Sequence, residues 1–519
     1  MPTDLQLPQI NLPVVYPLAV LVVVGCVMLL LDAFVPKVKG GAFAAVSVLA
    51  LMLSGGMLVF ATSIPGLPLS RWPQQAFGGM LIFDRMTVLA SLIIFASAIF
   101  TVLLSHDYLR TVDVPAREYY TLVVFAALSM VLLCASHDLI TLFVSLEMLS
   151  LCLYVLVAIN RRSQASQEGA LKYFLLGSAA SAFLLLGIAY VWGVTGTTNL
   201  AQIRLELIVP LGAGGNRWLL LAGALLMIGF AFKLALVPFH QWVPEAYQGA
   251  PTPVTAFLAT GSKAAGVVAL LHVFQSLSGW ELAADFTLPV LTALAVVTIV
   301  AGNVLAVVQT NIKRLLAYSS VAHSGYMLVG VLVFALNAGG HPALAARALD
   351  AVLFYLFAYT ALNMVAFGVA SALAPWGDSE IANLGGLVYR RGGLAAAMSV
   401  AMFGLTGIPF TVGFSAKFYV FGAAVDAGFI PLVVMAFLAS VISAYYYLRV
   451  VVVMTMAAEP AEWGGGAQRQ ADGAACVGRP VGHGAVPATS GASLFVIGFC
   501  TAVSFVFFFF PESFLRLFV

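Results

Sequence analysis

Long apolar runs without a charged residue constrain this chain more than any other feature. Residues 119–135 and 289–308 are two such runs, each about as long as a helix that crosses a bilayer. Only 8% of the 519 residues are charged, too few to cover the surface of a water-soluble protein of this size. The sequence therefore predicts an all-α, polytopic membrane protein in contact with membrane lipid.

Composition also excludes two other classes of protein. A hydrophobic content of 62% is too high for a disordered chain. The chain has 23 Lys and Arg against 21 Asp and Glu, with no basic run, so it lacks the basic surface that nucleic acids require. We expect no nucleic-acid partner.

Charged or turn-rich breaks divide the chain into about fourteen apolar segments, each predicted to be a transmembrane helix. Two segments, 218–248 and 393–425, are too long for one straight span, and each carries an internal proline, Pro238 or Pro409. Because proline removes a helical hydrogen bond, we expect both helices to break there. The predicted segments are 14–34, 41–63, 84–106, 118–136, 138–159, 168–193, 218–248, 252–278, 287–309, 314–336, 347–373, 393–425, 429–456 and 492–510.

The predicted helices group into two units with flanking regions. The two breaks share the pattern Leu-x-x-(Val/Ile)-Pro-Phe, at 234–239 and 405–410. Each lies in the fourth helix of a set of five, and an odd number of helices predicts two inverted repeats, as in ion-translocating folds. The predicted regions are helices one to three (1–117), the first five-helix repeat (118–278), the second (287–456), a flexible Gly/Ala-rich loop (457–491) and the C-terminal helix (492–519).

Loop charges predict the orientation of the chain. If the N-terminus lies outside, the cytoplasmic loops hold about twice as many Lys and Arg residues as the outer loops, with Lys313 counted among the cytoplasmic loop cations. We therefore expect a multi-pass membrane protein with both termini on the outer side.

Charged residues inside the apolar segments are the least expected feature. Lys172, Lys233, Lys263 and Lys417 fall within predicted spans, and Glu147 is the one carboxylate near the middle of a span. A charge at the centre of a spanning helix costs about 2.5–3.5 kcal/mol on insertion scales. Because burial disfavours the charged form of lysine and of glutamate, such groups are suited to load and release protons.

The broken helices predict different surroundings for two of these lysines. Lys233 comes five residues before Pro238, near the carbonyl end of a half-helix, where the helix dipole favours a cation. Lys417 comes eight residues after Pro409, beyond the N-terminus of a half-helix, where the dipole opposes a positive charge and should ease proton loss.

Several of these residues also have a purely structural interpretation. Lys172 follows Glu168 by four residues, so an ion pair near a span end would explain it. His323 and His240 are each compatible with a proton relay or with a hydrogen bond inside a helix bundle. His272, toward a span end, fits a structural role better.

Three runs carry a resemblance to a known family. VPFHQWVPEAYQGAPTPVTAFLATGSKAAG (237–266), SLEMLSLCLYVLVA (145–158) and KYFLLGSAASAFLLLG (172–187) resemble the antiporter-like membrane subunits of complex I, the proton-pumping NADH:quinone oxidoreductase, and its subunit N above all. Related subunits occur in multisubunit sodium/proton antiporters and membrane-bound hydrogenases. The resemblance covers roughly residues 80–450.

The resemblance implies roles for individual residues. It implies a hydrated polar axis halfway through the membrane, in which Glu147 is the ion-pair partner of Lys233 and His323 is suited to bridge the axis. The positions that match the family's glutamate and its lysines of the sixth, seventh, eighth and twelfth helices are Glu147, Lys172, Lys233, Lys263 and Lys417.

The predicted function is proton translocation by a membrane-arm subunit of complex I. The five cysteines form no CxxC pair, so we expect no metal or redox cofactor in this chain, and flavin and iron–sulfur clusters in partner subunits. The expected partners are other membrane subunits of complex I, protons and internal water. A Na⁺/H⁺ antiporter subunit and a structural spacer are the alternatives.

Overall fold

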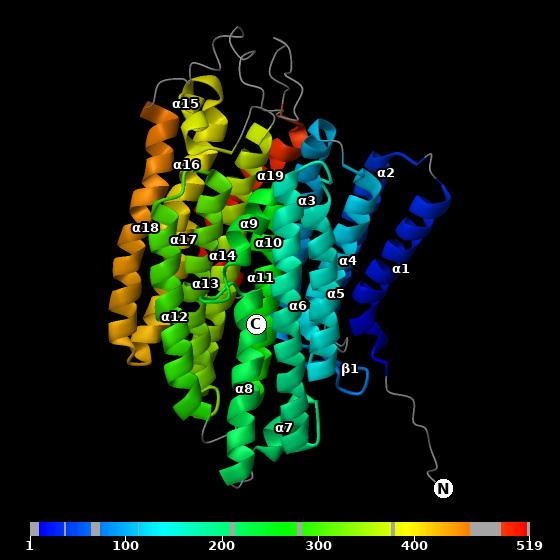
Figure 1. Cartoon of the computed structure of the whole chain (residues 1–519), viewed down its shortest axis with the longest axis vertical. Coiled ribbons are helices and arrows are strands. Elements are labelled where there is room, and N and C mark those ends of the chain that lie inside the picture. The colour runs from blue at the N-terminus through cyan, green and yellow to red at the C-terminus, as the bar shows by residue number, and fades with distance from the viewer. Residues whose placement is uncertain are drawn as a thin grey trace.

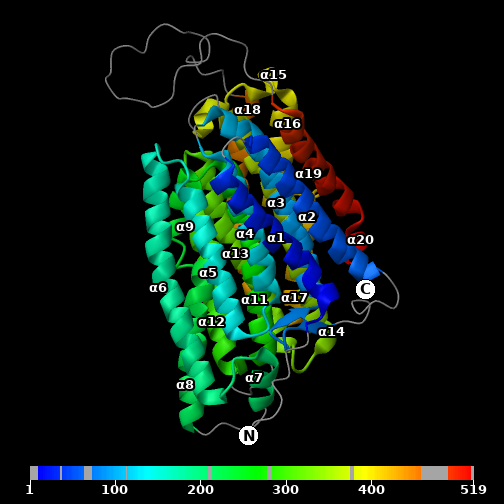
Figure 2. The ribbon, with the colours of Figure 1, turned by 90° about the vertical axis from the view of Figure 1, so that its right-hand side faces the viewer.

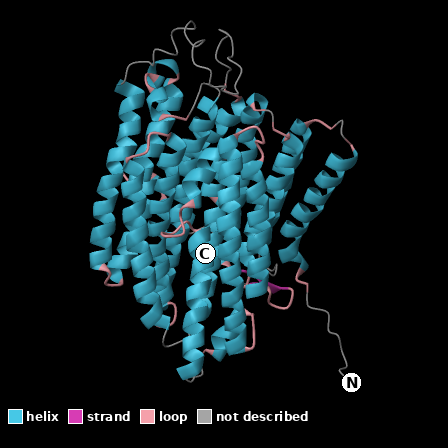
Figure 3. Ribbon diagram, in the orientation of Figure 1, coloured by secondary structure: helices cyan, strands magenta, loops and turns pink. Residues whose placement is uncertain are grey.

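Helices account for nearly all of the computed structural model and run side by side in one bundle (Figures 1 and 3). The structure describes residues 10–35, 38–63, 73–112, 114–207, 213–277, 283–374, 379–456 and 489–515. Within these residues, twelve helical segments are long and apolar enough to cross a membrane. The predicted all-α membrane class is therefore confirmed, while the division into regions and the inversion of the two repeats stay predictions.

The N-terminal region contains a short hairpin that the sequence did not predict. Strands β1 (Gln74–Ala76) and β2 (Leu81–Phe83) pair in antiparallel fashion before α3. They are too short to show an alternating pattern over four or more residues. Asp84 then begins α3, since its carboxylate accepts the amide hydrogen of Thr87 at 2.8 Å. The three helices of this region are α1 (Leu12–Phe34), α2 (Gly40–Ser63) and α3 (Arg85–Thr111).

Three long helices and a short one open the first predicted unit. Polar side chains set where they start: Asp138 caps α5, Ser163 caps α6 and Asn199 caps α7, each by accepting backbone amide hydrogens. The long helices agree with the predicted spans to within four residues, whereas α7 was not predicted. The four are α4 (Ala116–Ala135), α5 (Leu139–Ala158), α6 (Gln164–Thr195) and α7 (Leu200–Glu206).

Both predicted helix breaks are present. Pro238 lies between the two halves of the predicted span 218–248, and Pro409 lies between the halves of 393–425. Proline ends a helix because it lacks an amide hydrogen and its ring collides with the preceding turn. The four half-helices are α8 (Ala213–Lys233), α9 (Trp242–Gly249), α16 (Gly392–Thr406) and α17 (Val412–Asp426).

A third break divides a segment that was predicted to be one helix. The span 252–278 consists of α10 (Thr252–Ala259) and α11 (Gly261–Leu277). Thr260 between them departs from helical geometry, with φ −109° and ψ −77°, and its hydroxyl shares a 2.6 Å hydrogen bond with Ser97 on α3. No proline marks this position, and the apolar pattern predicted one continuous helix across it.

The second predicted unit and the C-terminal helix complete the bundle. The Gly/Ala-rich loop 457–491 lies outside the described residues apart from its last three positions. The remaining elements are α12 (Ala283–Val307), α13 (Ile312–Asn337), α14 (Pro342–Leu373), a 3₁₀ turn η3 (Ile381–Leu384), α15 (Leu387–Arg390), α18 (Ile430–Met456), α19 (Gly491–Phe509) and α20 (Pro511–Leu515).

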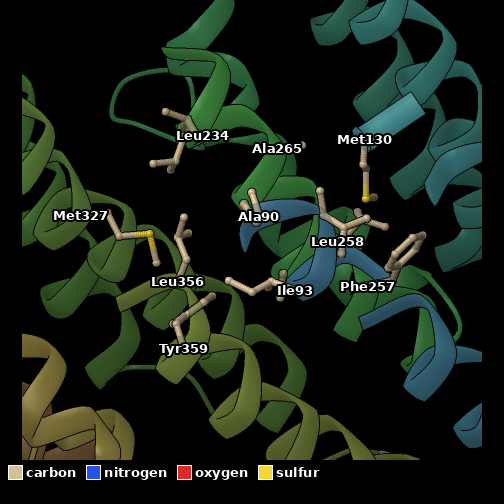
Figure 4. Packing of buried hydrophobic residues seen from close by; sticks show 14 of the residues in the cluster. Ala90, Ile93, Met130, Leu234, Phe257, Leu258, Ala265, Met327, Leu356 and Tyr359 are labelled. Atoms are coloured by element: carbon tan, nitrogen blue, oxygen red, sulfur yellow. The ribbon is translucent and has the colours of Figure 1, made fainter. Parts of the chain in front are cut away.

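The core lies around α10, α11, α13 and α14, whose side chains are almost entirely buried. Peripheral helices expose large apolar side chains, as helices facing lipid or a partner subunit do. In Figure 2, α1 and α2 lie across one face of the bundle, while α6 and α8 form one edge. Figure 4 shows apolar side chains of the core that come from α3, α4, α10, α11, α13, α14 and the break after α8: Ala90, Ile93, Met130, Leu234, Phe257, Leu258, Ala265, Met327, Leu356 and Tyr359.

Helix α9 packs on α6 through two glycines that bring the backbones into contact. A Cβ atom on Gly249 would overlap the carbonyl oxygen of Ala165, and one on Gly169 would lie 2.7 Å from the carbonyl oxygen of Glu245. Neither carbonyl can give way without a shift of its helix. The two glycines therefore fix the position of α9 against α6.

We expect Gly249→Ala to destabilise the protein by about 1–3 kcal/mol, the usual cost of overpacking. A thermal unfolding scan of the purified protein should show a lower midpoint. The matched control is Gly193→Ala on α6, where an added Cβ meets nothing within 4 Å; this midpoint should stay the same or rise, since Ala favours helix. Equal midpoints for the two variants would contradict the packing account.

Candidate functional site

The first break ends α8 at Lys233 with a Schellman motif. The amide of Leu236 donates to the carbonyl of Ala231 at 2.8 Å, and the amide of Ala235 donates to the carbonyl of Phe232 at 3.1 Å. Ala235 has a φ of +60°, the left-handed conformation that this motif needs. Lys233 is thus the last residue of a half-helix, as predicted, at the negative end of its dipole.

The Lys233 ammonium is buried without a direct partner. Its side chain is only 3% exposed, and Nζ has no hydrogen-bond partner among the described residues. The predicted ion pair with Glu147 is not a direct contact here: no hydrogen bond joins Lys233 Nζ to the Glu147 carboxylate, which accepts one from Ser181 on α6. Glu147 lies near enough to act on Lys233 through its charge, but not through a hydrogen bond.

Lys263, in the first turn of α11, reaches across to the second predicted unit. Its Nζ donates to the backbone carbonyl of Ser320 and, at 2.7 Å, to the hydroxyl of Ser324, both on α13. The ammonium also lies 5.4 Å from the centroid of the Tyr359 ring on α14. The acceptors of this buried lysine are therefore neutral oxygens and an aromatic face.

His323 lies beside the aromatic rings that face Lys263 and Lys417. Its ring centroid is 5.0 Å from that of Tyr359, which faces Lys263, and 5.7 Å from that of Tyr326, which faces Lys417. Its Nδ1 shares a 2.7 Å hydrogen bond with the hydroxyl of Tyr355, and its Nε2 lies 3.3 Å from the hydroxyl of Tyr447. The imidazole therefore has hydroxyl partners on both ring nitrogens, and its role as a bridge along the polar axis stays a prediction.

Lys417 points back to the first half of its broken helix, which corrects the predicted dipole environment. Its Nζ donates to the carbonyl of Thr406 at 2.7 Å and to the hydroxyl of Ser440 at 2.5 Å, and it lies 4.9 Å from the centroid of the Tyr326 ring. Thr406 ends α16, so the ammonium meets the negative end of that dipole. The prediction failed because it used only the half-helix that carries the lysine.

The second break repeats the backbone hydrogen bonds of the first. The amide of Ile408 donates to the carbonyl of Phe403 and the amide of Gly407 to that of Gly404, both at 3.0 Å, with a φ of +89° at Gly407. This is again a Schellman motif. A Cβ on Gly407 would also lie 2.9 Å from Cδ of Lys417. Glycine at this position therefore allows the left-handed turn and leaves room for the side chain of Lys417.

Lys172 is not part of the buried row, which comprises Lys233, Lys263, His323 and Lys417. Its side chain is 45% exposed and pairs with Glu168 at 2.6 Å, while Glu245 lies 3.9 Å away. The predicted i to i+4 ion pair is present, and the structural interpretation of Lys172 fits the geometry better than a place on the polar axis.

Lys313 is a buried lysine that the sequence analysis counted as a loop cation. It is only 5% exposed, and its Nζ donates to the carbonyls of Gln248 at 2.9 Å and Ala250 at 2.6 Å, at the end of α9. The available signal was Asn311, a helix-capping residue type two positions earlier. Asn311 caps α13 and places Lys313 in its first turn instead of a loop.

His240 and His272, the other two histidines considered in the sequence analysis, differ in their surroundings. His272 is buried, and its Nε2 lies 3.2 Å from the hydroxyl of Thr87 on α3, in line with the structural role expected for it. His240 lies beside Tyr318, with ring centroids 6.4 Å apart. Among the described residues, no group of three or more His, Cys, Asp or Glu side chains is arranged to hold a metal ion.

Comparison with known proteins gives a consistent family. A family model described as "NADH:quinone oxidoreductase/Mrp antiporter, TM" matches residues 136–443. NADH-quinone oxidoreductase subunit N of Trichlorobacter lovleyi is 39% identical over 86% of this chain and 88% of its own length. Subunit N 2 of Roseiflexus castenholzii is 41% identical over 88% of this chain and 90% of its own. This chain belongs to the NADH:quinone oxidoreductase/Mrp antiporter membrane-subunit family.

A solved structure extends the family likeness to the fold. A chain of respiratory complex I from Thermus thermophilus, determined with bound aureothin, is 31% identical, with a TM-score of 0.76 over 97% of this chain and 99% of that chain. The stretch matched by the family model contains both proline breaks and the buried row from Lys233 to Lys417. The resemblance predicted from short runs is thus confirmed over most of the chain.

Replacing Lys313 and Lys172, the two lysines described above that lie outside the row, tests whether the first is buried and bonded and the second exposed. Lys313→Ala removes the donor to the buried carbonyl of Ala250, and an unsatisfied buried polar group costs about 1–3 kcal/mol. We expect a clearly lower thermal unfolding midpoint for this variant. Lys172→Ala removes only an exposed ion pair and should leave the midpoint nearly unchanged. An equal or larger drop for Lys172→Ala would contradict these assignments.

Proposed function

We propose that this chain is a proton-translocating membrane-arm subunit of NADH:quinone oxidoreductase. It moves H⁺ through the membrane, and redox chemistry in other subunits drives the movement. The subunit N names of the relatives support the assignment to this complex. The observation that carries the proton-translocating role is the buried row Lys233, Lys263, His323 and Lys417.

Physical chemistry explains why such a row suits proton transfer. Lys233, Lys263 and Lys417 are each 7% exposed or less, so burial disfavours their charged forms. Lys263 and Lys417 bind neutral oxygens, which stabilise an ammonium less than a carboxylate does. A small change in a neighbouring charge then suffices to load or unload a proton.

The order of transfer follows the positions of the groups. The negative charge of Glu147 stabilises the protonated form of Lys233 without a hydrogen bond between them. A conformational change in a neighbouring subunit weakens this electrostatic interaction. The proton passes through internal water to Lys263. From there, His323 carries it toward Lys417, which releases it on the outer side. The hydroxyls on both nitrogens of His323 allow its ring to accept a proton at one nitrogen and give one up at the other.

The surroundings of the subunit follow from the same assignment. This chain holds no redox cofactor of its own, and flavin and iron–sulfur clusters reside in partner subunits. Other membrane subunits of complex I and lipid cover its exposed apolar helices. The protein lies in a bacterial inner membrane with both termini on the outer side, the orientation that the loop charges favour.

Replacement of Lys233 tests the proposal. We expect assembled complexes with Lys233→Ala to pump far fewer protons per NADH oxidised, because the variant removes one group of the row. The measurement is the number of protons pumped into inside-out membrane vesicles per NADH oxidised with quinone. NADH oxidation with an artificial electron acceptor checks that the vesicles hold equal amounts of assembled complex. Lys172→Ala is the matched control, a lysine of the same bundle outside the row, and should pump nearly normally.

Two results would overturn the assignment. A full proton-to-NADH ratio in the assembled Lys233→Ala complex would show that the row carries no transported proton. Sodium-dependent proton movement without NADH would indicate the antiporter function instead.

A further inference from the structure

The short helix α9 hydrogen-bonds to a residue next to Lys233 and to a residue that accepts from Lys263. At its start, the indole nitrogen of Trp242 donates to the carbonyl of Phe232, next to Lys233, at 3.1 Å. Five residues later, the hydroxyl of Tyr247 shares a 3.1 Å hydrogen bond with the hydroxyl of Ser320. The carbonyl of that same serine accepts from Lys263.

The hydroxyl of Ser320 joins two helices. Some buried helical serines here, such as Ser91, Ser129 and Ser145, donate to the carbonyl four residues earlier. Ser320 bonds instead to Tyr247 on α9, much as its neighbour Ser319 bonds to Tyr447 on α18. Ser320 is fully buried and Tyr247 is 1% exposed, so this bond lies away from bulk solvent.

Helix α9 is also held firmly on its remaining sides. Its backbone touches α6 at Gly169 and Gly249. Arg314, at the start of α13, donates to Glu245 at 3.2 Å and to the side chain of Gln248 at 3.0 Å. Helix α9 is thus in direct contact with the end of α8, with α6 and with α13.

We propose that Tyr247 is a positioning residue for proton transfer at Lys263, through its hydrogen bond to Ser320. The bond keeps the Ser320 hydroxyl away from its own helix and sets the place of the carbonyl that receives Lys263. Through Trp242, the same helix ties this acceptor to the end of α8 beside Lys233. This inference rests on the proposed function and adds a residue that acts on the transfer without touching the proton.

Paired substitutions test the hydrogen bond itself. Tyr247→Phe keeps the ring and removes the hydroxyl, and Ser320→Ala removes the partner. Each should slow NADH-driven proton pumping about two- to tenfold, the range that the loss of one neutral hydrogen bond corresponds to. The double variant should be no slower than the slower single variant, because both changes remove the same bond.

A control and a second readout separate positioning from packing. Tyr119→Phe removes a comparable buried hydroxyl, 2.6 Å from Ser105 on α3, away from the row, and should pump at the native rate. The ionisable groups around Lys263 are Tyr247 on α9, His323 on α13 and Tyr359 on α14. The pH profile of pumping should change in Tyr247→Phe and stay native in Tyr119→Phe.

The outcomes separate this inference from the proposed function. Native rate and pH profile in Tyr247→Phe would overturn the inference alone, provided that Lys263→Ala has lost pumping. Fully additive losses in the double variant would also overturn it, because the two residues would then act independently. Native pumping in Lys263→Ala would overturn the proposed function, and the inference with it.

Discussion

The cost of placing an ammonium group in a low-dielectric interior governs this structure. An uncompensated buried charge is too expensive to persist, so each buried lysine needs a local source of negative potential. Lys263, Lys313 and Lys417 all find it in backbone carbonyl oxygens. The carbonyls of Thr406 and Ala250 lie at helix ends, where the last turn leaves carbonyls without a partner inside the helix, whereas the carbonyl of Ser320 lies within α13.

Helix breaks therefore do more than bend the chain. The end of α16 presents Thr406 to Lys417, and the end of α9 presents carbonyls to Lys313. Carbonyls hold a cation without fixing its charge as tightly as a carboxylate does. Lys233 has the least support, with no hydrogen-bond partner and only the distant charge of Glu147. We therefore propose that a neighbouring subunit switches the charge of Lys233 most easily and that transfer starts there.

The sequence predicted those parts of the structure that depend on local chemistry. Apolar runs predicted the membrane helices, and Pro238 and Pro409 predicted two breaks, because each signal acts on its own segment. The break at Thr260 was missed since it depends on contacts such as the one with Ser97 on another helix. The partners of Lys417 and the burial of Lys313 were missed for the same reason: both depend on carbonyls from other elements. For Glu147, family resemblance predicted the right neighbourhood but not the hydrogen bond with Ser181.

The central claim is that protons move sideways along the buried row through water held between the two predicted units. A cryo-electron microscopy map of the assembled complex in lipid, sharp enough to show ordered water, tests it most directly. The account predicts an unbroken file of waters and hydroxyls from Lys263 past His323 to Lys417, with successive donor–acceptor distances of about 2.5–3.2 Å. A dry layer of packed apolar side chains between Lys263 and Lys417 would contradict it.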